Sequence, residues 1–306
     1  MNYYPVVIPT LCRFEHFKRC VESLAKNTHA KNTELIIGLD YPARKEHWDG
    51  YKKICNYLTE IEGFKEITII KHDANIGAIK NLNTIRDYAY KKYDAIILSE
   101  DDNEFSPCFL DYMNRSLMKY ANYPNIVSVS GYTTTCYTNI SKYKTIFTYD
   151  SSAWGIGLWK NKQETYDKDC YSLIIPLKSF WKIYKTFPAC ILMFLYMIKS
   201  NTIFEDTIKT AKNIIEKRYQ LRPSVSMVRN WGIDGTGIHC GIDDSFSRQE
   251  IQKATIFEID DRPIEVENKI NKKTFYVCLP TNKFKAWRTI IKTGILYLKY
   301  KFLKKI

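Results

Sequence analysis

The sequence predicts an α/β fold in which a mostly parallel β-sheet is flanked by helices. Short apolar runs alternate with amphipathic helical segments through the first 130 residues. One of these runs, at 95–98, leads directly into three consecutive carboxylates. A chain of 306 residues with 45% hydrophobic residues can bury a large core. Because crossovers between parallel strands are right-handed, the carboxyl ends of the strands should share one edge of the sheet.

The expected elements of the first half follow from hydrophobic periodicity. Helix 14–27 places Phe17, Val21 and Leu24 on one face, and helix 107–121 has a proline in its first turn. Strand 95–98 is a continuous apolar run, as in a strand buried on both faces. The complete set is strands 4–8, 35–39, 67–70, 95–98 and 126–130, and helices 14–27, 45–61, 76–93 and 107–121.

The alternation stops near residue 131, and the second half is less regular. We expect loops and short strands at 133–149, an apolar helix at 177–199, a helix at 207–219 and a strand at 223–228. The apolar core of the 177–199 segment is 12 residues long and contains Pro188, so it is too short to span a bilayer. We divide the chain at 131 and 245: residues 1–131 and 132–245 form two halves of one domain, and 246–306 is an extension.

Charge and cysteine usage exclude several classes of protein. Residues 283–306 hold eight Lys/Arg and no Asp/Glu, so much of the net charge of +13 lies in the tail. This distribution argues against a nucleic-acid groove along the domain. The nine cysteines are odd in number and form no CxxC pair, which favours reduced thiols in a cytosolic protein. No signal peptide is visible at the N-terminus.

The tail itself has the pattern of a basic amphipathic helix. Apolar residues recur at intervals of three and four, and lysines and arginines fall between them. Such a helix suits an anionic membrane surface, which predicts a peripheral protein on the inner face of the cytoplasmic membrane. The alternative is a C-terminal helix docked on the domain with a solvated charged face. The apolar positions are Phe284, Trp287, Ile291, Ile295, Leu298 and Phe302.

The acidic run Glu100, Asp101 and Asp102 follows the apolar strand at 95–98. Three neighbouring carboxylates repel one another unless a cation shares them. Hard oxygen ligands after a strand suit Mg²⁺ or Mn²⁺ that carries a phosphate substrate. The simpler interpretation is a helix N-terminus, where acids are favoured, because Ser106 and Pro107 follow.

Further polar residues follow the other strands and should lie along the same edge. Thr10 and Arg13 come after the first strand and can hold the sugar or phosphate of a nucleotide. Asp40 ends the second strand and can accept hydrogen bonds from a base or ribose, or can cap a loop. Lys80 lies one turn into the helix after the third strand and could reach a phosphate.

These residues resemble a known family. The run 99–107 (SEDDNEFSP), together with 7–24 and Asp40, resembles the nucleotide-sugar domain of GT-A glycosyltransferases, which has a Rossmann-like fold. The similarity is to the N-acetylglucosaminyltransferase I group and its bacterial family-2-like relatives. Segments 152–155 and 230–240 also resemble the bacterial relatives, and the resemblance covers about residues 4–241.

The resemblance implies roles for individual residues. Asp102 matches the acid that binds a divalent metal on the donor diphosphate, and Glu100 and Asp101 match acids that contact the donor. Arg13 and Asp40 match positions used for the nucleotide, commonly uridine.

The resemblance also implies a catalytic base in an acidic pair ahead of the last strand. Asp206 takes the second place of such a pair, but Thr207 replaces the tryptophan that often follows, so Glu205 is kept as the fallback. His239, in a glycine-rich loop, is a further metal or pyrophosphate candidate, because a neutral imidazole tolerates Mn²⁺. A structural hydrogen bond is the alternative for His239.

The resemblance therefore predicts a metal-dependent, inverting glycosyltransferase that uses a UDP-sugar and Mn²⁺ or Mg²⁺. The expected acceptor is a glycan or lipid-linked glycan in bacterial surface polysaccharide assembly. A sugar nucleotidyltransferase is one alternative, although Pro9 to Arg13 contain no glycine and that class usually has a glycine-rich loop there. A non-catalytic module that binds a membrane surface is the other.

Overall fold

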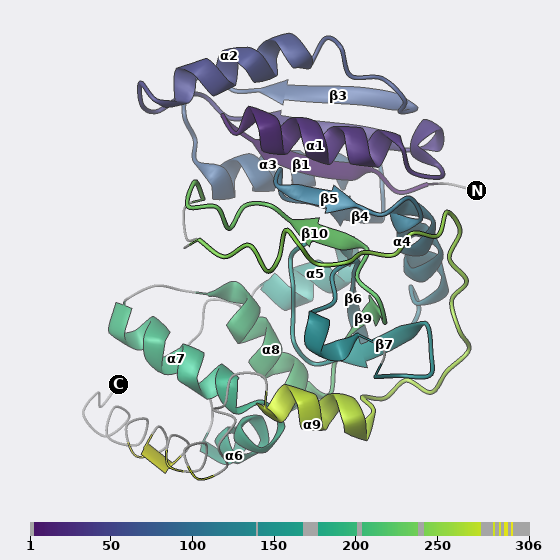
Figure 1. Cartoon of the computed structure of the whole chain (residues 1–306), viewed down its shortest axis with the longest axis vertical. Helices are drawn as coiled ribbons and strands as arrows, with labels where there is room; N and C mark the ends of the chain where they lie inside the picture. The colour runs from purple at the N-terminus through teal and green to yellow at the C-terminus, as the bar shows by residue number, and fades with distance from the viewer. Residues whose placement is uncertain are drawn as a thin grey trace.

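The computed structural model describes residues 3–138, 140–167, 177–200, 204–237 and 242–276, and five further residues (284, 288, 291, 292 and 295). Within these ranges, one eight-stranded sheet has the order β3-β2-β1-β4-β8-β6-β9-β7 (Figure 1). Helices pack against the sheet, so the α/β class predicted from the sequence is confirmed.

Strands and helices alternate in the first half as the periodicity predicted, with small differences at the ends. The elements are β1 (Val6–Thr10), α1 (Phe14–Ala25), β2 (Glu34–Leu39), α2 (His47–Tyr57), β3 (Glu66–Lys71), α3 (Ala78–Ala89), β4 (Ala95–Leu98), β5 (Asn103–Phe105), α4 (Phe109–Lys119) and β6 (Ile126–Ser130).

The second half combines short strands with helices. Its elements are β7 (Thr145–Thr148), β8 (Ile156–Trp159), α5 (Lys160–Asp167), α6 (Leu177–Thr186), α7 (Pro188–Ser200), α8 (Glu205–Glu216), β9 (Tyr219–Pro223), β10 (Val228–Asn230) and α9 (Asn268–Tyr276). No described helix is both long and apolar enough to cross a membrane.

Strand directions bring the expected site residues to one edge. β1 pairs in parallel with both β2 and β4, and β2 pairs in parallel with β3. β8 lies antiparallel between β4 and β6, so β4 and β6 run in the same direction. β9 is parallel to β6, and the short connection after α8 places the N-terminus of α8 near the carboxyl ends of the strands. The acids after β4 and at the start of α8 therefore face one edge.

Three predicted elements of the second half differ from the structure. The predicted strand 223–228 is wrong: β9 ends at Pro223, which has no N–H to continue a ladder, and β10 begins at Val228. The hydroxyl of Ser226 turns the chain between them by donating to the Val228 carbonyl at 2.8 Å. The predicted helix 177–199 is two helices, α6 and α7, because Pro188 interrupts the hydrogen bonds of a helix interior. The predicted helix 207–219 begins earlier and ends at Glu216.

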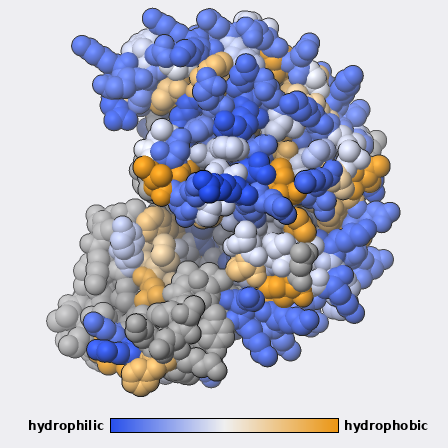
Figure 2. All heavy atoms as spheres, in the orientation of Figure 1, coloured by the Kyte–Doolittle hydropathy of each residue, from blue (hydrophilic) through white to orange (hydrophobic). Residues whose placement is uncertain are grey.

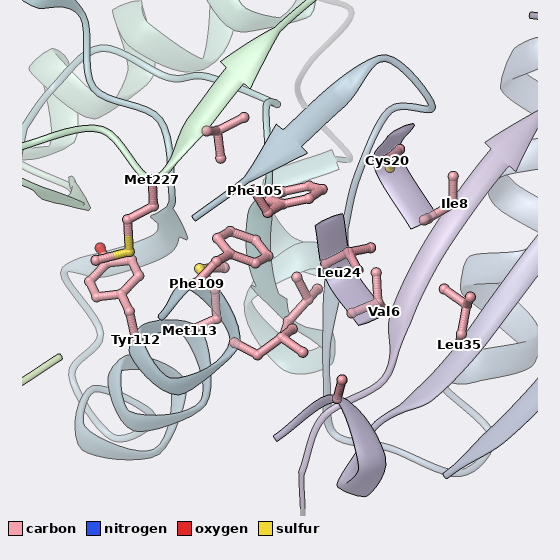
Figure 3. Packing of buried hydrophobic residues seen from close by; sticks show 14 of the residues in the cluster. Val6, Ile8, Cys20, Leu24, Leu35, Phe105, Phe109, Tyr112, Met113 and Met227 are labelled. Carbon is pink, nitrogen blue, oxygen red and sulfur yellow. The ribbon is translucent and has the colours of Figure 1, made fainter. Parts of the chain in front are cut away.

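Residues of the main core lie on both sides of the acidic run in the sequence and hold it in place. Phe105 of β5 and Phe109 of α4 pack ring to ring at 4.3 Å between centroids, and Figure 3 shows them between α4 and the Leu24 side of α1. Val6 of β1 and Met113 of α4 belong to the same buried cluster. Each large side chain of this kind contributes roughly 1.5–3 kcal/mol through burial. The turn after β4 is thus anchored on both sides by core residues.

Candidate active site

The acidic run forms a tight turn between β4 and β5. The Ser99 hydroxyl donates to the Glu100 carbonyl at 2.7 Å and accepts a hydrogen bond from Asn103 Nδ2 at 3.2 Å. β5 then pairs antiparallel with β10, which brings Asn103 opposite Asn230. The sequence did not predict this two-stranded ladder, because its strands are three residues long and each contains a single apolar residue. The ladder connects the turn to the loop that follows β10.

Asp101 is buried and is held by the two residues expected to bind the nucleotide. Its Oδ2 accepts from Thr10 Oγ1 at 2.8 Å, and its Oδ1 forms an ion pair with Arg13. Burial raises the pKa of Asp101, and the Arg13 guanidinium opposes this by favouring the carboxylate. Thr10 and Arg13 thus support the acids here, and their role toward a nucleotide stays a prediction.

Asp102 is surrounded by partners from distant parts of the chain. Arg13 Nη2 lies 2.8 Å from one carboxylate oxygen, and Asn230 Nδ2 donates to the other at 2.8 Å. The backbone N–H of Trp231 donates to the Asp102 carbonyl at 2.9 Å. A Cβ on Gly232 would overlap the Asp102 carboxylate, so only glycine fits there. These contacts fix the position of the carboxylate that was expected to bind metal.

The loop after β10 is tied to α1 and β5 by side chains. Trp231 Nε1 donates to Glu104 Oε2 at 2.7 Å, and the Arg19 guanidinium lies over the Trp231 ring at 4.1 Å. His16 Nε2 is 3.0 Å from Asp234 Oδ2. Sequence reasoning singled out this loop for its glycines, for His239 and for a resemblance, and did not identify it as a support for Asp102.

Glu100 is the acid of the run that faces solvent. Protein atoms nevertheless surround its carboxyl closely, and this desolvation raises its pKa to about 8, with further contributions from Asp102, Asp206 and Asp101. Arg13 opposes the shift, but it is already shared by the two neighbouring aspartates. Among the residues that the structure describes, Glu100 therefore forms no ion pair of its own.

The pair at the start of α8 divides into two different environments. Glu205 forms an ion pair with Lys209 on its own helix, at 3.3 Å. Asp206 is exposed, and its backbone carbonyl accepts a hydrogen bond from Thr210 Oγ1 at 2.7 Å. Desolvation by nearby protein atoms raises the pKa of Asp206, whereas the charges of Lys209 and Arg222 lower it. The two acids thus lie in different surroundings.

The two halves of the predicted site lie close together. The negative charge of Asp206 is near enough to raise the pKa of Glu100, although the two residues are far apart in sequence. Figure 2 shows a hollow on this face between the part that carries β5 and β10 and the part that carries α8. A donor at the acidic run and an acceptor beside α8 could therefore meet in one place.

Both carboxylate oxygens of Asp40 accept hydrogen bonds from nearby loop residues. One oxygen accepts from the N–H groups of Tyr41 and Ile76, at 2.8 and 2.9 Å, and the other accepts from Asn75 Nδ2 and the Gly77 N–H, at 3.2 and 2.9 Å. These contacts fill the lone pairs of a carboxylate. The structure thus favours the loop-capping alternative for Asp40, and a nucleotide contact stays a prediction.

Lys80 and His239 are the remaining predicted site residues. Lys80 is exposed in the first turn of α3, and His239 lies outside the described residues. Among the described residues, no group of three or more His, Cys, Asp or Glu side chains is arranged to hold a metal. Mg²⁺-type sites often use one or two carboxylates and complete their shell with substrate phosphates and water. Asp102 and Glu100 fit a site of that kind.

A separate open groove of about 550 Å³ lies along the outer side of α1. It is lined by α1 residues such as Lys18 and Glu22, by Glu104 and by residues 251–253. Neither Glu100 nor Asp206 lines it, so it is distinct from the acidic edge. Its lining mixes both signs of charge and does not define a ligand.

Fold and acidic edge together define a glycosyltransferase of the GT-A type. The family model described as glycosyl transferase family 2 matches residues 6–171, more than half of the chain. The protein therefore belongs to glycosyltransferase family 2. The matched region contains β1 to β8 and the acidic run, whereas Asn230 and Gly232, which contact Asp102, lie outside it.

Solved structures show distant similarity, and no curated protein matches the chain. A structure of S. aureus TarS is 14% identical with a TM-score of 0.35, over 57% of this chain and 30% of that one. A structure of TarS residues 1–349 is 13% identical with a TM-score of 0.36, over 55% and 50%. The mannosyltransferase PcManGT from Pyrobaculum calidifontis, in complex with GDP-Man and Mn²⁺, is 12% identical with a TM-score of 0.39, over 70% of both chains. At these TM-scores the similarity carries no argument about donor, metal or acceptor.

Proposed function

We propose that the protein is a metal-dependent, inverting glycosyltransferase that moves a sugar from a UDP-sugar to a glycan or lipid-linked glycan. One observation carries the proposal: the strand directions bring Glu100 after β4 and Asp206 at the start of α8, from opposite halves of the chain, to one edge of the sheet, and the charge of Asp206 contributes to the raised pKa of Glu100. A transferase that moves a sugar from a nucleoside diphosphate to a hydroxyl needs both a group that binds the diphosphate and a base near the hydroxyl. Bacterial surface polysaccharide assembly is the setting that we propose, by analogy.

On the donor side, Asp102 and Glu100 would hold Mn²⁺ or Mg²⁺. The cation would neutralise charge on the leaving diphosphate. Arg13 and Asn230 keep the Asp102 carboxylate in place. Desolvation raises the pKa of Glu100, the neighbouring carboxylates add to the shift, and a bound cation would favour the ionised form of Glu100. Asp101 is occupied by Thr10 and Arg13 and orients the turn. His239 is a further candidate ligand, on sequence grounds alone.

On the acceptor side, Asp206 would be the general base. An acceptor hydroxyl is a weak nucleophile at neutral pH, and a positioned carboxylate that takes its proton contributes roughly 10²–10⁴-fold to the rate. A single base that acts opposite the leaving group gives one displacement and inversion at the anomeric carbon. Asp206 is preferred over Glu205 because its charge acts on Glu100, whereas Glu205 is paired with Lys209.

The basic tail supports a proposed location at the cytoplasmic face of a membrane. Phe284, Ile291 and Ile295 are exposed, as are Arg288 and Lys292. Exposed apolar side chains beside basic ones suit an anionic lipid surface. Deletion of residues 283–306 should abolish sedimentation with vesicles of anionic lipid and leave activity on a soluble acceptor unchanged. Retained sedimentation would contradict this assignment.

A screen of nucleotide sugars tests the proposed activity. UDP-glucose, UDP-galactose, UDP-N-acetylglucosamine and GDP-mannose are incubated with the protein and Mn²⁺, and nucleotide release is measured. We expect release from one UDP-sugar, and loss of that release when EDTA replaces Mn²⁺. Release of pyrophosphate from a sugar phosphate and UTP would instead indicate a nucleotidyltransferase. The absence of any nucleotide binding would indicate a non-catalytic module.

A further inference from the structure

One side of α1 carries a row of three side chains that are basic or imidazole. Arg13, which caps the helix, is followed at intervals of three by His16 and Arg19, and residues three apart are neighbours on a helix surface. We call these three residues the α1 row. The helix packs on the core through other positions, namely Phe17, Cys20, Val21 and Leu24. The α1 row therefore lies outside the apolar face of the helix.

The second and third members of the α1 row contact the loop at 230–236, which follows β10. The Arg19 guanidinium lies over the Trp231 ring at 4.1 Å from the ring centre, and His16 Nε2 is 3.0 Å from Asp234 Oδ2. The first member of the row pairs with the acidic run itself. One helix thus contacts both the acidic run and the loop that packs against it.

Arg19 also determines which nitrogen of His16 carries the proton. Arg19 Nη1 lies 3.5 Å from His16 Nδ1, and a guanidinium can donate a hydrogen bond but cannot accept one. In this arrangement Nδ1 of the imidazole accepts, and Nε2 carries the proton that points to the Asp234 carboxylate. The two members of the row therefore act together on the loop.

The same loop holds Asp102 through three hydrogen bonds. Asn230 Nδ2 donates to the Asp102 carboxylate at 2.8 Å, and the Trp231 N–H donates to the Asp102 carbonyl at 2.9 Å. The Gly232 N–H donates to Asn230 Oδ1 at 3.0 Å and so orients the Asn230 amide. Residues 234–236 are exposed, so burial does not hold the far end of the loop. Polar contacts with α1 are what fix this end.

We propose that His16 and Arg19 are positioning residues for the donor side: they fasten the loop at 230–236 to α1, and this attachment keeps the hydrogen-bond donors of the loop on Asp102. The inference rests on the proposed function, in which Asp102 binds the metal of the donor. Neither His16 nor Arg19 contacts the donor in this account. Side chains that orient a metal ligand from outside change metal affinity when they are removed.

Hydrogen exchange of the metal-free protein tests the attachment. The backbone amides of Trp231 and Gly232 donate the hydrogen bonds that the loop makes at this site. In His16→Ala, both amides should exchange roughly tenfold faster, because the loop opens more often once a polar contact is lost. Arg19→Gln removes the cation from the Trp231 ring and should act in the same direction. It serves as the second variant if His16→Ala does not fold.

Calorimetric titration with UDP tests the consequence for the donor. In His16→Ala, the Kd for UDP with Mn²⁺ should rise by up to roughly tenfold, and the Kd in EDTA should stay unchanged. His16→Gln places an amide N–H where the imidazole Nε2 lies and can still donate to Asp234. This variant should restore both the slow exchange and the Kd, which a loss of general stability would not do.

His29→Ala is the matched control. His29 Nε2 lies 3.2 Å from Asp111 Oδ1, so this pair is also an imidazole in contact with an aspartate from a distant part of the chain. It joins the segment after α1 to α4 and does not involve the loop at 230–236. Loss of His29 should leave the exchange of the loop amides and the Kd for UDP as they are in the wild type.

The outcomes separate the inference from the function on which it rests. Unchanged exchange of the loop amides in both His16→Ala and Arg19→Gln shows that α1 does not hold the loop, and overturns the inference. Faster exchange with an unchanged Kd for UDP overturns the positioning role, because the loop then moves without an effect on the donor. A wild type that shows no Mn²⁺-dependent binding of UDP overturns the proposed function, and faster exchange in the variants would then show that the attachment itself was assigned correctly.

Discussion

The acids on the two sides of the candidate site are held in opposite ways. Asp101 and Asp102 are buried, and each is in direct contact with Arg13 and a second polar side chain. Asp206 is exposed at the start of α8, and the charges of Lys209 and Arg222 lower its pKa, although no ion pair joins either of them to its carboxylate within the part of the chain that the structure describes. The difference fits the two roles that we propose. A carboxylate that binds a metal must stay ionised, and ion pairs favour that form, whereas a general base needs a carboxylate oxygen that is free to accept a proton.

The largest effect should come from the base side. Asp206→Asn keeps the size of the side chain but cannot accept a proton, so kcat should fall by roughly 10²–10⁴-fold with little change in the affinity for UDP. Steady-state kinetics and calorimetric titration with UDP separate the two quantities. Glu205→Gln serves as the comparison and should keep most activity, because Glu205 is paired with Lys209. The reverse pattern would show that the base is Glu205.

A substitution that displaces the Asp102 carboxylate should instead weaken the binding of UDP. Gly232→Ala places a methyl group where the Asp102 carboxylate lies, and overpacking of this kind costs about 1–3 kcal/mol. We expect the Kd for UDP in the presence of Mn²⁺ to rise roughly tenfold, with a smaller change in kcat. Ile242→Ala, which shortens an exposed side chain of the same region, should bind UDP normally. Normal binding by Gly232→Ala would mean that the position of Asp102 does not control the donor.

A smaller effect distinguishes the two interpretations of Asp40. In Asp40→Asn an amide NH₂ replaces one oxygen and faces backbone donors, so the free energy of unfolding should fall by about 1–3 kcal/mol. Denaturant unfolding measures this change, and Asp73→Asn on the exposed part of the same loop is the control. Unchanged stability together with lost UDP binding would identify Asp40 as a nucleotide ligand.

The two sides of the candidate site also differ in how well the sequence predicts them. The strands and helices up to residue 130 are local patterns, and their common edge follows from the handedness of the crossovers. The acidic run after β4 was therefore placed correctly at the edge of the sheet. Its partners were not predicted, because Asn230 reaches Asp102 across the β5–β10 ladder, a contact between residues 128 positions apart.

The second half of the chain was harder to predict for a physical reason. A period-two pattern treats polar residues of a strand as facing solvent. Gln220 and Arg222 are buried in β9, where they hydrogen-bond the backbone of Ser152 and Asp150. The expected helix therefore extended into β9, and the expected strand began too late. Polar groups that hold another segment carry no local signal, and only the folded structure shows their partners.

The most direct test of the account compares metal-dependent UDP binding in two variants. UDP is titrated into wild type, Asp102→Asn and Asp206→Asn, with Mn²⁺ and with EDTA. The account predicts that Mn²⁺ strengthens binding to wild type and Asp206→Asn alike, and that Asp102→Asn loses this gain. It is contradicted if Asp102→Asn keeps the full effect of Mn²⁺, or if Asp206→Asn loses it.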